Sequence, residues 1–289
     1  MTVWARLIRA HTSLWGNTFS AAGLRNNGRM IELIVRLAPE YRTKTPLLFV
    51  HGAWHGAWCW DRGFLDFFAD RGWNSYALSL RNHGESLPRG SLRWTRHSAY
   101  LEDIASVAEG FERPPVLIGH SMGGYLVQKY MESHEVAAAV LLASVPVSGT
   151  FAASLRFARR HPLQFAKLVA TMSLWPVVGK PELVREHLIG TTASDDEVEE
   201  LLVAIQDESF LTYLDMMGLA LPRPGRTEAP VAVFAAAADG LFTVSEARRT
   251  AEAYGVEATI LADLPHDVML HPEWPQAARS IARFLEVVT

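Results

Sequence analysis

The sequence predicts an α/β fold: a mostly parallel central sheet flanked by helices, with a helical cap insertion. Two observations predict it. Short apolar runs alternate with longer amphipathic stretches, and the alternation stops once, between about residues 150 and 230, where only helix-like patterns occur. Strands that alternate with helices favour parallel pairing, because each crossover helix returns the chain to the end of the sheet where the strand began.

The expected strands are short runs rich in apolar and β-branched residues. They are Met30–Leu37, Leu47–His51, Asn74–Leu80, Val116–Gly119, Ala138–Ser144, Val231–Ala237 and Ala258–Leu264. Between them, apolar residues recur at helical spacing in stretches such as Trp60–Arg71, Ser98–Phe111 and Ser245–Tyr254. This pattern is typical of a sheet that is covered by helices on both faces.

The segment between Thr150 and Pro230 contains no convincing strand. Its expected helices are Ala152–Arg160, Pro162–Ser173, Pro181–Ile189, Asp195–Ile205 and Ser209–Met217. Ser194 and Glu197 have the spacing of a capping box at the start of the fourth helix. We therefore divide the chain into a core in two parts, residues 1–149 and 230–289, and a helical cap, residues 150–229, which does not fold as a separate domain.

The composition excludes several classes of function. The chain has 289 residues, 49% hydrophobic and 20% charged, which provides enough apolar surface for a full core. A net charge of −4 gives no reason to expect nucleic acid or an anionic membrane as a partner. The lone Cys59 excludes an internal disulfide and a Cys-rich metal site, and it suits a reducing compartment.

No membrane span, metal or cofactor is expected. No apolar run reaches the roughly 18–20 residues that a span needs, and the arginine-containing N-terminus lacks the cleavage site of a signal peptide. We therefore expect a cytoplasmic protein without a stable membrane anchor. His51 and His55 have a His-x-x-x-His spacing, but they lie in a Gly-containing loop where helical facing does not apply.

The clearest chemical signal is Gly119-His120-Ser121-Met122-Gly123. It follows the expected strand Val116–Gly119 and precedes a helix-like stretch. A residue at the apex of a sharp strand-to-helix turn is strained, so the residues two positions away on either side must be small. We interpret Ser121 as a nucleophile; the alternative is a Gly-rich turn with an idle serine.

A serine hydroxyl needs a base, and the base needs a carboxylate to orient it. His266 and Asp239 each follow the end of a later expected strand, so both are predicted at the same edge of the sheet as Ser121. Three other carboxylates compete with Asp239 for the role of the acid: Asp263, Asp267 and, inside the cap, Asp215.

With these residues in place, the chain resembles the α/β-hydrolase superfamily over about residues 28–289. The resemblance implies Ser121, Asp239 and His266 as nucleophile, acid and base. Pro265 departs from the Gly that is more usual in the family before the histidine. The backbone N–H of Met122 follows from the turn as one oxyanion-hole donor, and by resemblance to the family's His-Gly-x loop Ala53 supplies the other.

The stretch HGAWHGAW resembles the front loop of plant methyl esterases, hydroxynitrile lyases and bacterial relatives. We expect His51 to brace this loop by hydrogen bonding, and Trp58 and Trp60 to pack the following helix against the sheet. Arg81 and His83, in LRNHGESL, are expected to brace the turn after the next strand.

The cap is expected to select the substrate, because it is rich in apolar side chains of which a minority should face the catalytic edge. The pocket candidates are Trp54, Met172, Trp175, Met216 and Met217. Arg156, Arg159 and Arg160 form either a solvated helix face or a clamp for a substrate carboxylate.

These observations predict a serine hydrolase that cleaves a carboxylic ester of a small apolar molecule through an acyl-enzyme. The same three residues could instead cleave a thioester, a lactone, a carbon–carbon bond or a cyanohydrin, or support peroxidase-like promiscuity. The alternative from a different functional class is a binding protein that retains the fold but does not turn over its ligand.

Overall fold

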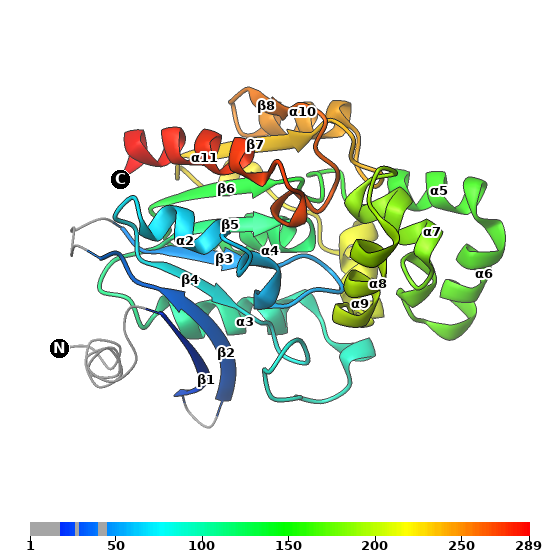
Figure 1. Cartoon of the computed structure of the whole chain (residues 1–289), viewed down its shortest axis with the longest axis horizontal. Coiled ribbons are helices and arrows are strands. Elements are labelled where there is room, and N and C mark those ends of the chain that lie inside the picture. Colours follow the sequence, from blue (N-terminus) through cyan, green and yellow to red (C-terminus); the bar gives the residue numbers. More distant parts are fainter. Residues whose placement is uncertain (1–17, 27–28, 40–44) are drawn as a thin grey trace.

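The computed structural model describes residues 18–26, 29–39 and 45–289 (Figure 1). In this part of the chain, one sheet of eight strands has the order β1-β2-β4-β3-β5-β6-β7-β8. The strands are β1 (Thr18–Asn26), β2 (Arg29–Arg36), β3 (Leu47–Val50), β4 (Ser75–Leu78), β5 (Val116–His120), β6 (Ala138–Leu142), β7 (Val231–Ala236) and β8 (Ala258–Leu261). Residues 1–17, in which no signal peptide is expected, lie outside the described residues.

The predicted fold class is confirmed. Strands β3 to β8 pair in parallel, while β2 pairs with β4, and β1 with β2, in antiparallel fashion. Each of the seven predicted strands is present, with ends that differ by up to a few residues. β1 was not predicted, so the sheet begins earlier in the chain than the sequence pattern indicated.

Helices cover both faces of the sheet (Figure 1). The helices of the core are α2 (Phe64–Ala69), α3 (His97–Ala108), α4 (Met122–Tyr130), α10 (Val244–Ala253) and α11 (Trp274–Val288). Single 3-10 turns lie at Ala57–Trp60, Leu92–Trp94, Trp175–Val177, Pro224–Arg226 and Val268–Leu270. The predicted helix Trp60–Arg71 is therefore divided into a 3-10 turn and the shorter helix α2.

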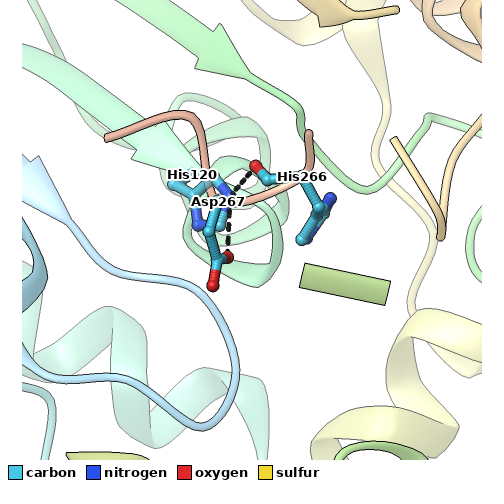
Figure 2. Close-up of side chains that lie close together, drawn as sticks. All are labelled: His120, His266 and Asp267. Carbon is cyan, nitrogen blue, oxygen red and sulfur yellow. Dashed lines mark hydrogen bonds and ion pairs between the residues drawn. The ribbon is translucent and has the colours of Figure 1, made fainter. Parts of the chain in front are cut away.

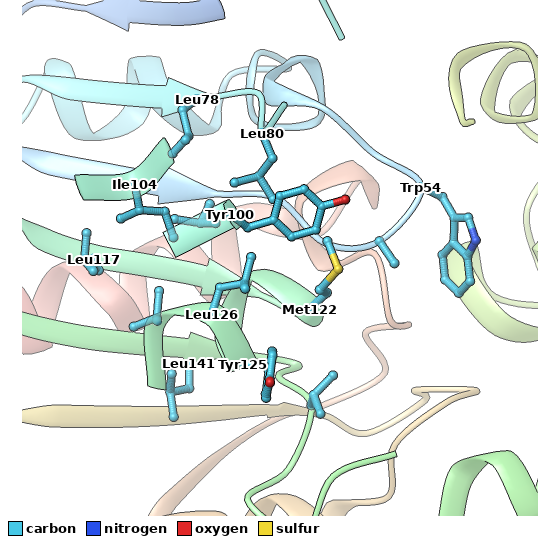
Figure 3. Close-up of a cluster of buried hydrophobic side chains, with 14 of the residues drawn as sticks. Trp54, Leu78, Leu80, Tyr100, Ile104, Leu117, Met122, Tyr125, Leu126 and Leu141 are labelled. Atoms are coloured by element: carbon cyan, nitrogen blue, oxygen red, sulfur yellow. The ribbon is translucent and has the colours of Figure 1, made fainter. Parts of the chain in front are cut away.

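The alternation of side chains along the strands builds two separate apolar layers. In β3, Leu48 and Val50 belong to the layer with α3 and α4, whereas Leu47 and Phe49 belong to the layer with α2 and α11. Figure 3 shows part of the first layer, where Tyr100 of α3 lies near side chains of the strands and of α4.

The prediction that Trp60 packs the following helix against the sheet is confirmed. Its fully buried ring lies 5.1 Å from the ring of Phe49 and 5.3 Å from that of Phe64, measured between centroids. Trp58 is only half-buried, and its ring stacks on the imidazole of His55 at 5.2 Å. Trp58 therefore packs on His55 within its own loop as well as against the apolar layers.

Residues 150–229 form a group of helices at the end of the sheet toward which the parallel strands point (Figure 1). These helices are α5 (Phe151–Arg160), α6 (Pro162–Thr171), α7 (Pro181–Val184), α8 (Asp195–Ala204) and α9 (Phe210–Leu214), with π-helical turns at Arg185–Ile189 and Asp215–Leu219. The capping box of Ser194 and Glu197 is present at the start of α8. We refer to this segment as the cap.

Ion pairs of two buried cap carboxylates join the cap to the core. The imidazole of His83 contacts the carboxylate of Glu208 at 3.0 Å, and both side chains are fully buried. Asp215 of the cap accepts hydrogen bonds from Arg96 and His97 at the start of α3. Because a buried charge is costly without a partner, these contacts stabilise the packing of the cap on the core.

A search of the described residues found no helix that is both long enough and apolar enough to cross a membrane.

Candidate active site

Ser121 occupies a sharp turn between β5 and α4. Its backbone has φ 52° and ψ −118°, a conformation that is rarely adopted by a residue with a side chain. A Cβ atom on Gly119 would lie 2.5 Å from the carbonyl oxygen of Gly123, and one on Gly123 would lie 2.2 Å from that of Val50. Only glycine fits at either position, which is the reason for the spacing seen in the sequence.

The structure brings the three predicted residues together. His266 follows β8, and its Nε2 lies 2.9 Å from Ser121 Oγ. Its Nδ1 lies 2.8 Å from Asp239 Oδ2, in the loop after β7. The three side chains form one hydrogen-bonded chain at the carboxyl edge of the parallel strands.

The surroundings of His266 favour a protonatable imidazole. Burial lowers the pKa of His266, but the charge and hydrogen bond of Asp239, together with the charge of Asp267, outweigh burial and hold this pKa above the ordinary 6.5. Asp239 is itself held in place, since its Oδ1 accepts hydrogen bonds from the backbone N–H groups of Leu241 at 2.7 Å and Phe242 at 2.9 Å. A carboxylate that is fixed in this way orients the ring.

The competing carboxylates lie elsewhere. Asp263 is exposed, and Asp215 is bonded to Arg96 and His97. Asp267 is fully buried, and its Oδ2 lies 3.1 Å from Nε2 of a different histidine, His55. Of the candidates, only Asp239 contacts His266 Nδ1.

The loop after β3 passes directly against Ser121. A Cβ atom on Gly52 would lie 2.9 Å from the Cβ of Ser121, so only glycine permits this approach. Ala53, the next residue, lines the same cavity as Ser121 and Met122. No group among the described residues accepts a hydrogen bond from the backbone N–H of Ala53 or Met122. Neither N–H is therefore committed to another group of the described chain.

Two further loops are braced as the sequence indicated. His51 Nε2 accepts a hydrogen bond from the backbone N–H of Leu80 at 3.0 Å, while its Nδ1 lies 2.8 Å from the carbonyl oxygen of Gly52. In the next turn, the guanidinium of Arg81 binds Asp103. His51 thus joins the ends of β3 and β4 and does not reach Ser121.

An apolar cavity of about 80 Å³ adjoins Ser121. Trp54 and Met216, two of the predicted pocket residues, lie on its wall. The other lining residues, which were not predicted as pocket residues, are Val145, Thr150, Ala153, Ser154, Phe157, Leu168, Leu174, Val177, Tyr213, Leu241 and Phe242. The position of Leu241 and Phe242 immediately after Asp239-Gly240 is a signal that could have placed them there.

The remaining predicted pocket residues, Met172, Trp175 and Met217, are not among those that line this cavity. Met172 caps the end of α6 with φ 49°. The ring of Trp175 lies against Gly179, where a Cβ atom would be 2.3 Å from its Nε1. Met217 follows Met216 in a helical turn, and consecutive helical residues point about 100° apart.

The basic residues of α5 do not line the cavity either. Arg156 binds the carboxylate of Glu246 and the carbonyl oxygen of Leu241. Arg160 binds Glu186 at 2.9 Å. Both guanidinium groups are thus engaged by this chain, which favours the interpretation as a helix face over that as a substrate clamp.

Two clusters of described residues hold His and carboxylate atoms close enough to share an ion. The first, His120, His266 and Asp267, is part of the site itself. The second, in the cap, comprises His161, Glu186 and His187. There, Arg160 Nε already lies 2.9 Å from Glu186 Oε1, so a cation of the chain neutralises this carboxylate.

The sheet, with a serine on a strained turn at its carboxyl edge, defines the class of protein as an α/β hydrolase. Comparison with known proteins agrees: the model of the alpha/beta hydrolase family matches residues 47–274. The chain belongs to this family.

Individual relatives match in part. The probable esterase PIR7A of Oryza sativa subsp. indica is 40% identical over 109 residues, 35% of this chain and 40% of the rice protein. A non-heme haloperoxidase of Rhodococcus erythropolis is 36% identical over 111 residues, 37% of this chain and 39% of that protein. The matched segments thus span about 40% of these relatives.

Solved structures match over the whole fold. A putative lipase from Acinetobacter baumannii AYE superposes with a TM-score of 0.71 at 15% identity, covering 100% of this chain and 97% of the lipase chain. A likeness at this identity shows that the fold is shared.

Proposed function

We propose that the protein is a serine hydrolase that cleaves carboxylic esters of small apolar molecules through an acyl-enzyme. The observation that carries the proposal is the chain of hydrogen bonds from Ser121 to His266 to Asp239, at 2.9 and 2.8 Å, beside an apolar cavity. The relatives that are named esterases support the same reaction type.

In the first step, Ser121 Oγ attacks the carbonyl carbon of the ester as its proton passes to His266 Nε2. Asp239 holds the Nδ1–H of the ring, so that Nε2 presents its lone pair to the serine. The carbonyl oxygen becomes an oxyanion and accepts hydrogen bonds from the N–H groups of Ala53 and Met122. The bond to the alcohol oxygen then breaks, and His266 donates its proton to the departing alkoxide.

In the second step, water replaces the alcohol. His266 takes a proton from this water while its oxygen attacks the acyl carbon, and a second oxyanion forms in the same place. When this intermediate collapses, the bond to Ser121 Oγ breaks and the serine regains its proton from His266. The acid leaves, and the side chains return to their starting protonation states.

The cavity favours a small, uncharged substrate group. Its volume of about 80 Å³ is roughly half of the 150 Å³ of a protein cavity that accommodates benzene. Its lining residues include no Lys, Arg, Asp or Glu among the described residues. An apolar acyl group of a few carbons fits this cavity. A carboxylate or a cyanide ion would have no cationic side chain on the cavity wall to bind it.

The absence of a cationic side chain from the cavity wall also bears on the alternatives, because it disfavours the cyanohydrin reaction more than ester, thioester or lactone cleavage. A thioester or lactone would use the same nucleophile, base and oxyanion donors. Ester hydrolysis is preferred because the similar segments belong to proteins that are named esterases.

A series of p-nitrophenyl esters with acyl chains of increasing length tests the proposal, with Ser121→Ala as the control. We expect the highest kcat/KM on the acetate to butyrate esters and a steep decline beyond them, with no turnover by the control. If the wild-type protein hydrolyses none of these esters, or if the Ser121→Ala variant is equally active, the proposal is wrong.

A further inference from the structure

The immediate chain neighbours of the proposed catalytic groups form a second buried cluster. His120 precedes Ser121, Asp267 follows His266, and His55 lies two residues after Ala53. Their side chains are at most 1% exposed. Figure 2 shows His120 and Asp267 beside His266, and the rings of His120 and His266 lie 4.8 Å apart between centroids. His55, His120 and Asp267 take no part in the proposed reaction.

His55 bridges Asp267 to the loop after β3, which contains Ala53. Its Nε2 lies 3.1 Å from Asp267 Oδ2, and its Nδ1 lies 2.7 Å from the carbonyl oxygen of Ala53. A carboxylate and a carbonyl can only accept hydrogen bonds, so each of these contacts places an acceptor oxygen at a ring nitrogen of His55. His55 therefore ties the Asp267 carboxylate to the loop after β3 through both of its ring nitrogens.

His120 connects the same cluster to the base. Its Nε2 donates a hydrogen bond to the backbone carbonyl of His266 at 2.9 Å and lies 3.8 Å from Asp267 Oδ1 (Figure 2). Burial lowers the pKa of His120 to about 3, so this ring is neutral. Asp267 is also held by its backbone N–H, which donates to the carbonyl oxygen of Leu188 in the cap at 2.9 Å.

Asp267 carries a negative charge next to the base. Burial alone would raise the pKa of Asp267, but the charge and hydrogen bond of His55, followed by the effects of His120 and His266, hold it at about 2. The titratable groups around this carboxylate are those three histidines and the buried thiol of Cys59, whose pKa is raised by burial and then by Asp267. The carboxylate is therefore ionised at neutral pH.

We propose that Asp267 and His55 form a positioning pair for the reaction. The pair holds the carbonyl of Ala53, the residue whose N–H is the proposed oxyanion donor, and it keeps a negative charge beside the His266 imidazole. This inference rests on the proposed function, since it assigns a role in that reaction to residues that do not touch the substrate. A pair that only stabilises the fold would change neither the turnover rate nor the basicity of His266.

The test is Asp267→Asn, compared with Asp263→Asn, a change of the same type at an exposed position four residues away. Removal of the negative charge lowers the pKa of His266. The base acts when it is neutral, so activity rises with pH through this pKa, which lies above 6.5 in the wild type. We expect the rising limb to move to lower pH, kcat to fall about 10- to 100-fold and KM to change less than about 3-fold. Asp263→Asn should match the wild type.

A folded Asp267→Asn variant whose kcat or whose pH limb equals that of the wild type would overturn the inference. If this variant does not fold, the double variant His55→Gln/Asp267→Asn serves instead, because it replaces both members of the pair by neutral amides and leaves no buried charge unpaired. A decrease in kcat and a shift of the limb in the same direction are expected, and the absence of either overturns the inference.

The imidazole titration of His266, followed by NMR and assigned with a His266→Gln variant, separates this inference from the proposed function. It reports basicity without turnover. If the wild type hydrolyses no ester, the proposed function fails, yet a lower pKa of His266 in Asp267→Asn would still support the charge effect. An unchanged titration would overturn it whatever the activity.

Discussion

Helices α4 and α5 both contribute to the wall of the cavity, but they are packed in opposite ways. Every residue of α4 except Lys129 is buried, whereas no residue of α5 is buried. Phe151 at the start of α5 is 60% exposed. The helix that follows the proposed nucleophile is thus part of the core, while the helix that faces it across the cavity lies on the surface.

This difference separates reaction chemistry from substrate selection. Around Ser121 even one added Cβ atom, on Gly119 or Gly123, would meet backbone atoms, so the turn that carries the proposed nucleophile is closely packed. In the cap, side chains can change without disturbing the core. Changes at the sheet edge should therefore abolish activity or folding, and changes in the cap should alter specificity.

The largest effect is expected for Asp239→Asn, which leaves the shape of the site intact but no longer fixes the tautomer of His266. We expect kcat for a short p-nitrophenyl ester to fall about 10⁴-fold. The Asp263→Asn variant is the matched control, because this carboxylate follows another strand but is exposed. Equal rates for the two variants would show that Asp239 is not the carboxylate that orients His266.

The second prediction concerns the stability of the turn. Gly123→Ala should lower the free energy of unfolding by about 3 kcal/mol or more, because the new methyl group would lie 2.2 Å from the carbonyl oxygen of Val50. Gly225→Ala, where a Cβ atom meets nothing within 4 Å, should change it by less than about 1 kcal/mol. Urea unfolding measures both. A mild effect at Gly123 would contradict the close packing of this turn.

The third prediction moves to the cap and compares two leucines of α6. Leu168 lines the cavity and is 2% exposed, whereas Leu163 is 75% exposed. Leu168→Ala enlarges the cavity, so the ratio of kcat/KM for the octanoate ester to that for the butyrate ester should rise about 10-fold or more. Leu163→Ala should leave this ratio unchanged. If both variants behave alike, the cavity does not hold the acyl group.

The smallest effect is expected on the outer surface of the cap. Phe151→Ser should change the free energy of unfolding by less than about 0.5 kcal/mol, since most of this ring is already in water. Thermal and urea unfolding give the value. A loss of more than about 2 kcal/mol would show that α5 is packed more tightly than the structure indicates.

The sheet and the positions of the proposed catalytic side chains can be predicted from the sequence alone, for one reason. Ser121, Asp239 and His266 each follow a parallel strand, and parallel strands end at the same edge of a sheet. β1 could not be predicted in this way. Its pairing with β2 shifts register between Ala21 and Leu24, and such an irregularity breaks the alternation by which a strand is recognised.

The residues that line the pocket could not be predicted, because a single sequence does not show which cap side chains face Ser121. The position of a cap side chain relative to Ser121 follows from how α5, α6 and α9 rest on the sheet edge, through contacts such as His83 with Glu208. Helical periodicity identifies an apolar stripe, but it does not identify what the stripe faces. For the same reason the sequence indicates Asp267 only as a competing acid, because its partner His55 lies far away in the sequence.

The central claim, that Ser121 is a nucleophile activated by His266, is tested most directly by labelling with a fluorophosphonate, followed by mass spectrometry of the peptides. The account predicts one label per chain, on Ser121, formed quickly in the wild type and at least about 100-fold more slowly in His266→Gln. No label on Ser121, or equal rates of labelling in the two proteins, would contradict it.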